Sequence, residues 1–230
     1  MTDHQPRALI TGASRGIGKA VAEALADTHD LLLGGRDVEA LKALASRLPS
    51  ARPWPAELTD ESAVASAVAD IDRLDVLVHS AGISRLGALT DVTAADWRDS
   101  YEINVVAVAE LTRLLLPVLR ESAGHVVLVN SGSGLKANPR WGAYAASKFA
   151  LRAYAEVLRG EEERNGLRVT SVHPGRTATE MQKGVRDFER GEYVPEQYMR
   201  PESVAGVIKA AIDTPRDAHV HEIVIRQPAR

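Results

Sequence analysis

Short apolar runs alternate with longer segments of helical periodicity along the whole chain. In each short run the apolar side chains occupy successive positions, which is typical of strands buried on both faces of a parallel sheet. These predicted strands cover residues 8–10, 31–33, 76–78, 126–129, 169–172 and 223–225. The helical patterns cover residues of about 17–28, 38–48, 60–71, 94–120, 142–164 and 202–213.

This alternation predicts the architecture of the protein. Strands that are covered on both faces and separated by helices require right-handed crossovers and a parallel sheet with a helical layer on each side. We therefore expect a doubly wound α/β fold with about seven strands and helices on both faces. No low-complexity linker or internal repeat divides the chain, so residues 1–230 are predicted to form a single domain.

Two of the predicted helices lack a polar face. Residues 104–119 and 141–158 carry apolar side chains at nearly every azimuth, and helices of this kind are buried on both sides. One side can cover the sheet, and the other then belongs either to a thick monomeric core or to a subunit interface. We favour the interface and predict a homodimer or homotetramer that associates through helices of about 94–120 and 142–164.

The composition excludes several classes of protein and of site. Lysine and arginine number 28 against 31 acidic residues, a net charge of −3, which gives no sign of a nucleic-acid partner. The absence of cysteine excludes disulfides and thiolate metal sites and is compatible with the cytoplasm, where we expect the protein. Residues 1–7 do not resemble a signal peptide, and charges interrupt each long apolar stretch, so no membrane segment is expected.

A glycine-rich turn joins the first predicted strand to the first predicted helix. Its glycines follow the spacing Gly-x-x-x-Gly-x-Gly, and the turn contains Gly12, Ser14, Arg15, Gly16, Ile17 and Gly18. Glycines at such a junction allow a tight turn, and the free N–H groups of a helix start bind phosphate. We predict that this turn binds the phosphates of a dinucleotide; the alternative is that the glycines only shape the turn.

The same turn also matches the nucleophile elbow of serine hydrolases. Residues 12–16 read Gly-x-Ser-x-Gly, which would make Ser14 a nucleophile. An elbow of this kind usually follows strands that form the centre of the sheet, whereas only about ten residues precede it here. The hydrolase is therefore the less favoured alternative.

A tyrosine and a lysine one helical turn apart form a second candidate site. Tyr144 and Lys148 occupy positions i and i+4 of a predicted helix and share one helix face. A tyrosine needs about 4 kcal/mol of phenolate stabilisation to exchange a proton near neutral pH, and an ammonium about 5 Å away supplies roughly 3 kcal/mol at an effective dielectric of about 20. We predict that Lys148 lowers the pKa of Tyr144 and that an oxidised nicotinamide supplies the remainder.

A serine follows the predicted strand 126–129. Ser131 precedes Tyr144 by 13 positions and lies at the carboxyl end of the sheet, where ligands bind in doubly wound folds. Its hydroxyl can donate to a substrate oxygen there. An ordinary Ser/Gly turn is the alternative, and Ser133 competes for the same role.

Together these residues resemble the short-chain dehydrogenase/reductase family, which comprises single-domain NAD(P)-dependent oxidoreductases with a Rossmann fold. The resemblance extends over nearly the whole chain, and the motifs occur in the order of the family. The positions that carry it are the turn 11–18, Ala81-Gly82, Asn104, Ser131, Tyr144, Lys148, and Pro174, Gly175, Thr177 and Thr179 in the segment 174–179.

The resemblance implies a role for each of these positions. Tyr144 is implied to be the general acid of carbonyl reduction, or the base of alcohol oxidation, and Lys148 to lower its pKa and bind the ribose. Ser131 is implied to hold the substrate oxygen and Asn104 to position a water molecule. The segment 174–179 is implied to hold the nicotinamide carboxamide. For Asn104, an ordinary polar residue of a helix interior is the alternative.

Two positions depart from the family pattern. Ser80 stands where the Asn-Ala-Gly motif of the family begins with asparagine, so the hydrogen bonds that brace the fourth strand are expected to differ. Glu57, followed by Leu58, stands where the family has an aspartate near the adenine at the end of the third strand.

Charge at the end of the second predicted strand favours NADP(H) over NAD(H). NAD enzymes place a carboxylate against the ribose 2′-hydroxyl, where this chain has Gly35 followed by Arg36. Arg15 stands in the glycine-rich turn, and two guanidinium groups suit a 2′-phosphate. Asp37 is the contrary evidence, although it can serve instead as the N-cap of the next helix.

The sequence thus predicts an NADP(H)-dependent oxidoreductase that transfers hydride between nicotinamide and a ketone or secondary alcohol. An NADP-binding regulatory protein without turnover is the alternative. Residues 181–200 are expected to form a substrate lid, and a carboxylated substrate is favoured if Arg85, Arg140 and Arg176 face the same pocket. No metal site is expected, because His219 and His221 have no third ligand beside them.

Overall fold

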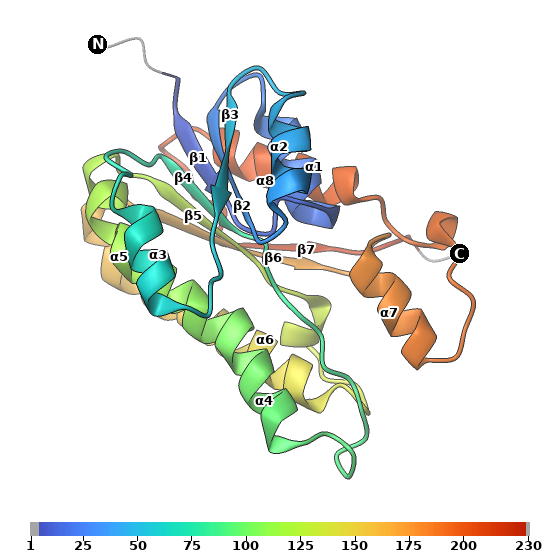
Figure 1. The fold of residues 1–230 in the computed structure, drawn as a ribbon. Helices are drawn as coiled ribbons and strands as arrows, with labels where there is room; N and C mark the ends of the chain where they lie inside the picture. The colour runs from blue at the N-terminus through green and yellow to red at the C-terminus, as the bar shows by residue number, and fades with distance from the viewer. Residues whose placement is uncertain (1–4, 229–230) are drawn as a thin grey trace.

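A single parallel sheet forms the centre of the protein. The computed structural model describes residues 5–228, and its seven strands follow the order β3-β2-β1-β4-β5-β6-β7 (Figure 1). The strands are β1 Arg7–Ile10, β2 Asp30–Gly35, β3 Ala51–Pro55, β4 Val76–His79, β5 His125–Val129, β6 Arg168–Pro174 and β7 Glu222–Ile225. The predicted doubly wound α/β fold is confirmed. The sequence inference about a signal peptide partly concerns residues 1–4, which lie outside the described residues.

The helices begin and end close to the predicted positions. They are α1 Gly16–Leu25, α2 Val38–Ala45, α3 Glu61–Val68, α4 Ala94–Tyr101, α5 Ala107–Glu121, α6 Gly142–Glu162, α7 Glu180–Phe188 and α8 Pro201–Asp213. The single helix predicted over 94–120 is wrong in one respect, because a π-helical segment, Glu102–Val106, joins α4 to α5. The helix α7 was not predicted as such; it lies within the segment expected to form a lid.

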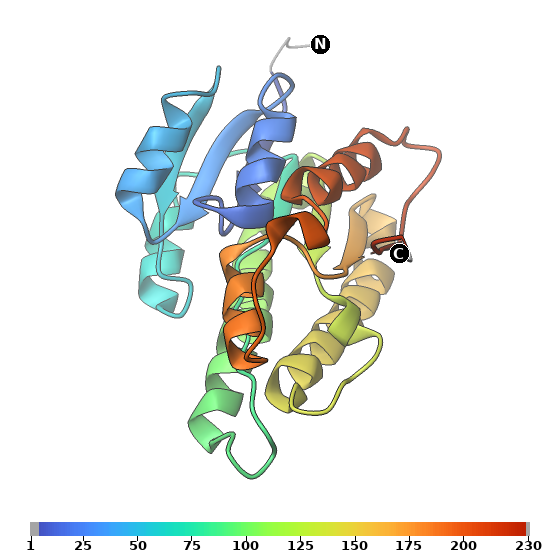
Figure 2. The same ribbon diagram turned by 90° about the vertical axis from the view of Figure 1, so that its right-hand side faces the viewer.

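Each face of the sheet has its own apolar core. Successive strand residues point to opposite faces, so Leu31 and Leu33 belong to the apolar cluster that includes residues of α1, α2 and α8, whereas Leu32 belongs to the cluster that includes residues of α3, α5 and α6. All three leucines are buried. The two helical layers lie on opposite sides of the sheet, and α7 projects beyond the strand ends without covering either face (Figures 1 and 2). The unbroken apolar runs of the sequence follow from this burial on both faces.

The strand β3 lies at one edge of the sheet, and β7 lies at the other. The strand β3 contains Pro53 and Pro55, and proline is tolerated at an edge because one side of the strand needs no ladder hydrogen bonds. Trp54 anchors the strand, since its indole Nε1 donates to the carbonyl oxygen of Ala67 at 2.8 Å. The ends of β2 and β3 thereby keep a fixed position beside the glycine-rich turn.

The described residues contain neither a candidate membrane-spanning helix nor a candidate metal-binding cluster. No helix within residues 5–228 is both long and apolar enough to cross a membrane. Over the same range, no cluster of three or more histidine, aspartate or glutamate side chains is arranged to hold a metal ion.

Candidate active site

A cleft of about 620 Å³ runs along the carboxyl ends of the central strands. It opens where the strand order reverses, because β1 lies between β2 and β4 in the sheet. Most of the predicted site residues line it: Gly12, Ser14, Arg15, Gly16, Ile17, Arg36, Glu57, Leu58, Ala81, Gly82, Ser131, Tyr144, Lys148, Pro174, Gly175, Thr177 and Thr179. Gly18 and Asn104 lie behind the cleft wall instead.

The glycine-rich turn makes room for a phosphate group. Gly12 has a φ of +67°, and a Cβ there would lie 2.9 Å from the backbone nitrogen of Ala81. A Cβ on Gly18 would lie 2.3 Å from the carbonyl oxygen of Gly12, so larger residues would push the turn away from α1. The first N–H groups of α1 face this space without side-chain caps. The turn therefore fits the diphosphate of a dinucleotide.

Thr11 braces the end of β4. Its Oγ1 accepts hydrogen bonds from the backbone N–H groups of Ser80 and Ala81, at 3.1 and 3.2 Å, and lies 3.5 Å from the carbonyl oxygen of Val78. Thr11, which directly follows β1, thus fixes the backbone at Ser80 and Ala81. The sequence indicates Thr11 only by its place directly before Gly12. Its hydrogen bonds to Ser80 and Ala81 could not be predicted, because they depend on the pairing of β1 with β4.

Ser131, Tyr144 and Lys148 meet at one end of the cleft. Ser131 follows β5, and the other two lie one turn apart on α6. The Ser131 side chain is hydrogen-bonded to the Tyr144 hydroxyl, and Lys148 Nζ lies 5.9 Å from the centre of the Tyr144 ring. Tyr144 and Lys148 are buried, and Lys148 Nζ donates to the carbonyl oxygen of Val129 at 3.2 Å. The predicted triad is therefore assembled.

The net lowering of the Tyr144 pKa that we predicted does not occur in the protein alone. Burial raises the pKa of Tyr144, and the hydrogen bond with Ser131 is what opposes this increase. Burial also lowers the pKa of Lys148 to about 8. The physical reason is desolvation, which disfavours the phenolate and the ammonium alike. A cationic nicotinamide beside the phenol would therefore supply a larger share of the stabilisation than the sequence argument assigned to it.

Asn104 lies in the π-helical segment and braces the cleft wall from behind. Its Oδ1 accepts from the N–H of Ile83 at 3.0 Å, and its Nδ2 donates to the carbonyl oxygen of Ile83 and to Ser147 Oγ, each at 3.0 Å. A Cβ on Gly82 would lie 3.0 Å from Asn104 Oδ1. The side chain thus fixes the segment after β4, which agrees with the structural alternative for this residue.

The far end of the cleft carries the charges expected to select the cofactor. Arg36 and Arg15 both line the cleft, and Arg36 forms an ion pair with Glu57 at 3.4 Å. Asp37 caps α2, since its carboxylate accepts from the N–H of Ala40 at 3.0 Å. The competing interpretation of Asp37 as a ribose ligand therefore loses its support.

The helix α7 closes one side of the cleft through Glu180, Met181 and Gln182. At its other end Arg176 donates through both terminal nitrogens to Glu189, and the Arg140 guanidinium lies 4.3 Å from the centre of the Phe188 ring. Neither arginine lines the cleft.

Arg85 does line the cleft, but it forms an ion pair with Asp99 at 3.1 Å. The expectation of a carboxylated substrate required that all three arginines face one pocket, and this premise is wrong. Arg176 pairs with Glu189 and Arg140 stacks on Phe188, both outside the cleft.

Sequence reasoning missed further residues of the cleft wall. Ile83, Ser84, Ile103 and Asn130 line it as well. Each stands close to a predicted position in the sequence, but which of these neighbours face the cleft depends on tertiary packing.

Comparison with known proteins gives the family. A model of the short chain dehydrogenase family matches residues 6–190. An uncharacterized oxidoreductase of Staphylococcus epidermidis is 30% identical over 226 residues, which cover 95% of this chain and 96% of that protein. The chain belongs to the short-chain dehydrogenase family. The predicted family resemblance is confirmed, and the serine-hydrolase interpretation of Ser14 is not.

Two further proteins are similar to this chain. Glycine betaine reductase ATRR of Emericella nidulans is 34% identical over 232 residues, which are 95% of this chain but 18% of that protein. A variant of the actinorhodin polyketide ketoreductase, solved with NADPH, superposes with a TM-score of 0.86 at 25% identity and covers 96% of this chain and 95% of its own. The short-chain dehydrogenase fold thus spans the described chain.

Proposed function

We propose that the protein is an NADP(H)-dependent oxidoreductase that transfers hydride between C4 of the nicotinamide and a ketone or secondary alcohol. One observation carries this proposal. The Ser131–Tyr144 hydrogen bond and the Lys148 ammonium lie in the same cleft as a glycine-rich turn that fits a diphosphate. The bound dinucleotide supplies the hydride; the residues of the chain supply binding, orientation and the proton.

Each of the three residues has a distinct task. Tyr144 donates its phenolic proton to the carbonyl oxygen during reduction and takes it back during alcohol oxidation. Ser131 orients the substrate oxygen and, by its hydrogen bond, lowers the pKa of Tyr144. Lys148 lies near the phenol and binds the ribose hydroxyls. Asn104 maintains the wall that faces them, through its bonds to Ile83.

The choice of NADP(H) rests on the charges at the ribose end. Arg15 and Arg36 present two guanidinium groups, which suit a 2′-phosphate, whereas the carboxylate of Asp37 is occupied as a helix cap. The polyketide ketoreductase that shares this fold was solved with NADPH. Glu57 lies at the adenine end and forms an ion pair with Arg36.

We further infer a single-domain, cytoplasmic homo-oligomer with α7 as part of its substrate lid. Apolar side chains of the helical layer remain exposed in the isolated chain, among them Tyr101, Val106, Phe149 and Val157. Val106, Phe149 and Val157 belong to the segments 104–119 and 141–158, whose sequence lacks a polar face, and Tyr101 lies just before the first of these segments. A second copy of the chain would cover them, which supports the homodimer or homotetramer.

The test is consumption of the reduced cofactor. Purified protein is mixed with NADPH or NADH and with a panel of ketones, keto acids, quinones and acyl thioester analogues. We expect NADPH oxidation with at least one carbonyl and a lower KM for NADPH than for NADH. Tight NADPH binding by calorimetry without turnover on any member of the panel would favour the regulatory protein instead.

A further inference from the structure

The backbone of Ser131 is held by polar side chains on both sides of its peptide groups. Its N–H donates to Asn130 Oδ1 at 2.8 Å, and its carbonyl oxygen accepts from His173 Nδ1 at 3.1 Å and from the N–H of Gly134 at 3.0 Å. Because a carbonyl oxygen only accepts, Nδ1 of His173 carries the proton. Burial lowers the pKa of His173, so the imidazole is neutral at pH 7 with its proton on Nδ1.

The imidazole of His173 is fixed from several elements. It lies on β6 directly before Pro174, and its side chain is fully buried. Glu222 of β7 lies 3.7 Å from Nε2, Arg152 of α6 pairs with Glu222 at 3.0 Å, and Arg226 donates to the His173 carbonyl oxygen at 2.6 Å. No protein atom in the described chain is hydrogen-bonded to Nε2 itself. The ring therefore has little freedom to release the carbonyl of Ser131.

The position of the Ser131 peptide decides where its hydroxyl points. Ser131 Oγ accepts from the N–H of Ser133 at 3.0 Å and is hydrogen-bonded to Tyr144. Even a small shift of this peptide weakens the hydrogen bond between Ser131 and Tyr144, because hydrogen bonds depend steeply on distance and angle. His173 itself does not line the cleft, and its side chain is linked to the site by the hydrogen bond to the carbonyl oxygen of Ser131.

We propose that His173 is a positioning residue that fixes the Ser131 hydroxyl against the phenol of Tyr144. This inference rests on the proposed function, since it assigns Tyr144 the proton transfer. The hydrogen bond from His173 Nδ1 to the Ser131 carbonyl oxygen is the interaction that performs this positioning. Its loss leaves the substrate oxygen and the phenol poorly aligned and removes the bond that keeps the pKa of Tyr144 from rising further.

Two substitutions separate the hydrogen bond from the bulk of the ring. His173→Leu removes the donor, whereas His173→Asn keeps an N–H close to the position of Nδ1. His125→Leu is the matched control, because His125 is also buried on the sheet but contacts Thr170 at the opposite strand ends. If His173→Leu does not fold, His173→Gln replaces it, since its amide reaches the position of Nε2 rather than Nδ1.

We expect kcat for carbonyl reduction to fall at least about tenfold in His173→Leu, and in His173→Gln where it is used, and to recover to within about threefold in His173→Asn. The dissociation constant of NADPH stays within about twofold of wild type in every variant. The pH at which alcohol oxidation reaches half its maximal rate moves upward in His173→Leu, because the pKa of Tyr144 rises. Wild-type kcat in His173→Leu, an equal loss in His173→Asn, or the same loss in His125→Leu would overturn the proposal.

If the proposed function is wrong, the wild-type protein itself shows no turnover with any carbonyl, which distinguishes this outcome from failure of the positioning role. The ¹³Cζ resonance of Tyr144, identified by its absence from Tyr144→Phe, then reports the hydrogen bond without turnover. A resonance displaced in His173→Leu and restored in His173→Asn supports the positioning role, and an unchanged resonance refutes it.

Discussion

The Arg36 guanidinium lies 3.4 Å from the carboxylate of Glu57, across the mouth of the cleft. Both side chains are largely exposed, so the pair contributes little to stability. The ion pair links Arg36, which follows β2, to the loop that follows β3. The same carboxylate competes with a ribose phosphate for the guanidinium.

Replacing Arg36 by aspartate should weaken NADPH far more than NADH. A hydrogen bond to a charged group contributes about 1.5–3 kcal/mol, so we expect the dissociation constant of NADPH to rise roughly 10- to 100-fold and that of NADH to change much less. Titration calorimetry measures both. Lys42→Asp, at an exposed position of α2, is the charge-matched control. Equal losses for the two cofactors in Arg36→Asp would contradict the assignment of NADP(H).

Removing the carboxylate should have the opposite effect. Glu57→Gln keeps the shape of the side chain but no longer competes for Arg36, so we expect NADPH to bind a few-fold more tightly and NADH to be unaffected. The gain should shrink as salt is added, because exposed charges are screened. Weaker NADPH binding in Glu57→Gln would instead mean that the ion pair orients Arg36 for the phosphate.

Tyr144→Phe tests the proton donor. General acid catalysis typically contributes 10²- to 10⁴-fold, so we expect kcat to fall by about that factor while NADPH binding stays within about twofold. Tyr154→Phe is the matched control, because Tyr154 lies on the same helix and is hydrogen-bonded to Thr112 outside the cleft. Turnover of Tyr144→Phe at the wild-type rate would remove the phenol from the reaction.

Much of the fold could be predicted because burial on both faces leaves a strong signal. The runs around Leu32, Leu77 and Val127 are apolar at every position since each residue faces one of two cores. Likewise, Tyr144 and Lys148 share a helix face by their spacing alone. Such features depend on residues close together in the sequence, which is why they were visible there.

Other features depend on contacts between distant segments. The bracing of Ser80 by Thr11, the pairing of Arg36 with Glu57 and the bond from His173 to Ser131 join different strands. The pKa of Tyr144 also depends on burial, which a helical spacing does not reveal. The helix α7 was missed because its buried face consists of Gln182 and Val185, too few apolar positions for a helical pattern.

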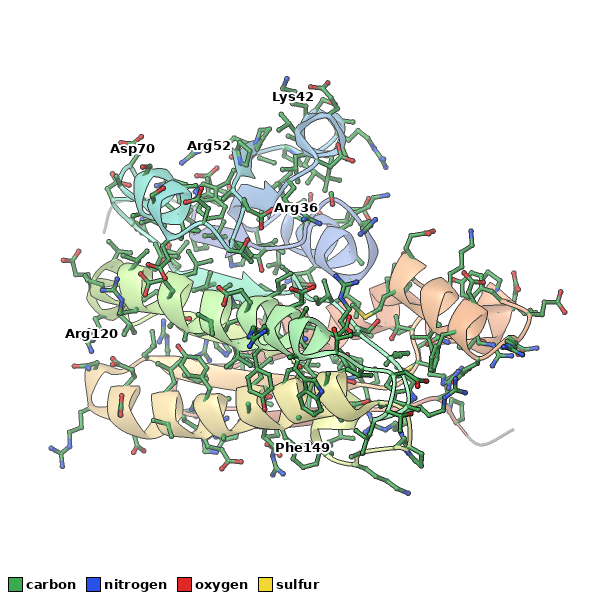
Figure 3. The ribbon with its side chains drawn as sticks, turned by 60° about the horizontal axis from the view of Figure 1, so that its bottom comes forward. Arg36, Lys42, Arg52, Asp70, Arg120 and Phe149 are labelled. Atoms are coloured by element: carbon green, nitrogen blue, oxygen red, sulfur yellow. The ribbon has the colours of Figure 1, made fainter. Side chains whose placement is uncertain are left out.

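The exposed apolar side chains of the helical layer predict the site of subunit association. Val106 and Phe149 are 44% and 41% exposed, and Figure 3 shows Phe149 on α6. We expect the wild-type protein to have two or four times the 24.8 kDa mass of the chain by light scattering. Val106→Glu combined with Phe149→Glu should yield monomers, because a subunit contact would bury the new charges. Val38→Glu, 37% exposed on α2, is the control; a wild-type mass of 24.8 kDa would refute the oligomer.

A buried histidine at the end of β4 should make the protein sensitive to acid. His79 Nε2 lies 2.9 Å from Thr112 Oγ1, and because that hydroxyl donates to the Val108 carbonyl oxygen at 2.7 Å, it accepts from His79. Burial lowers the pKa of His79 to about 3, well below its ordinary value of 6.5. The unfolded chain therefore binds a proton at a pH where the folded protein does not. The contribution of His79 to the free energy of folding is therefore fully present above pH 6.5 and is lost as the pH falls from there toward 3.

The loss attributable to this one residue amounts to about 3 kcal/mol by pH 4. In His79→Gln the amide still donates to Thr112 but does not titrate. Between pH 7 and pH 4, the free energy of unfolding of this variant should therefore fall by about 3 kcal/mol less than that of the wild type. Urea unfolding at the two pH values measures the difference. His221→Gln, at an exposed position, should keep the wild-type dependence. If His79→Gln loses stability as steeply as the wild type, a different group governs acid unfolding, and the neutral imidazole below β4 has no part in it.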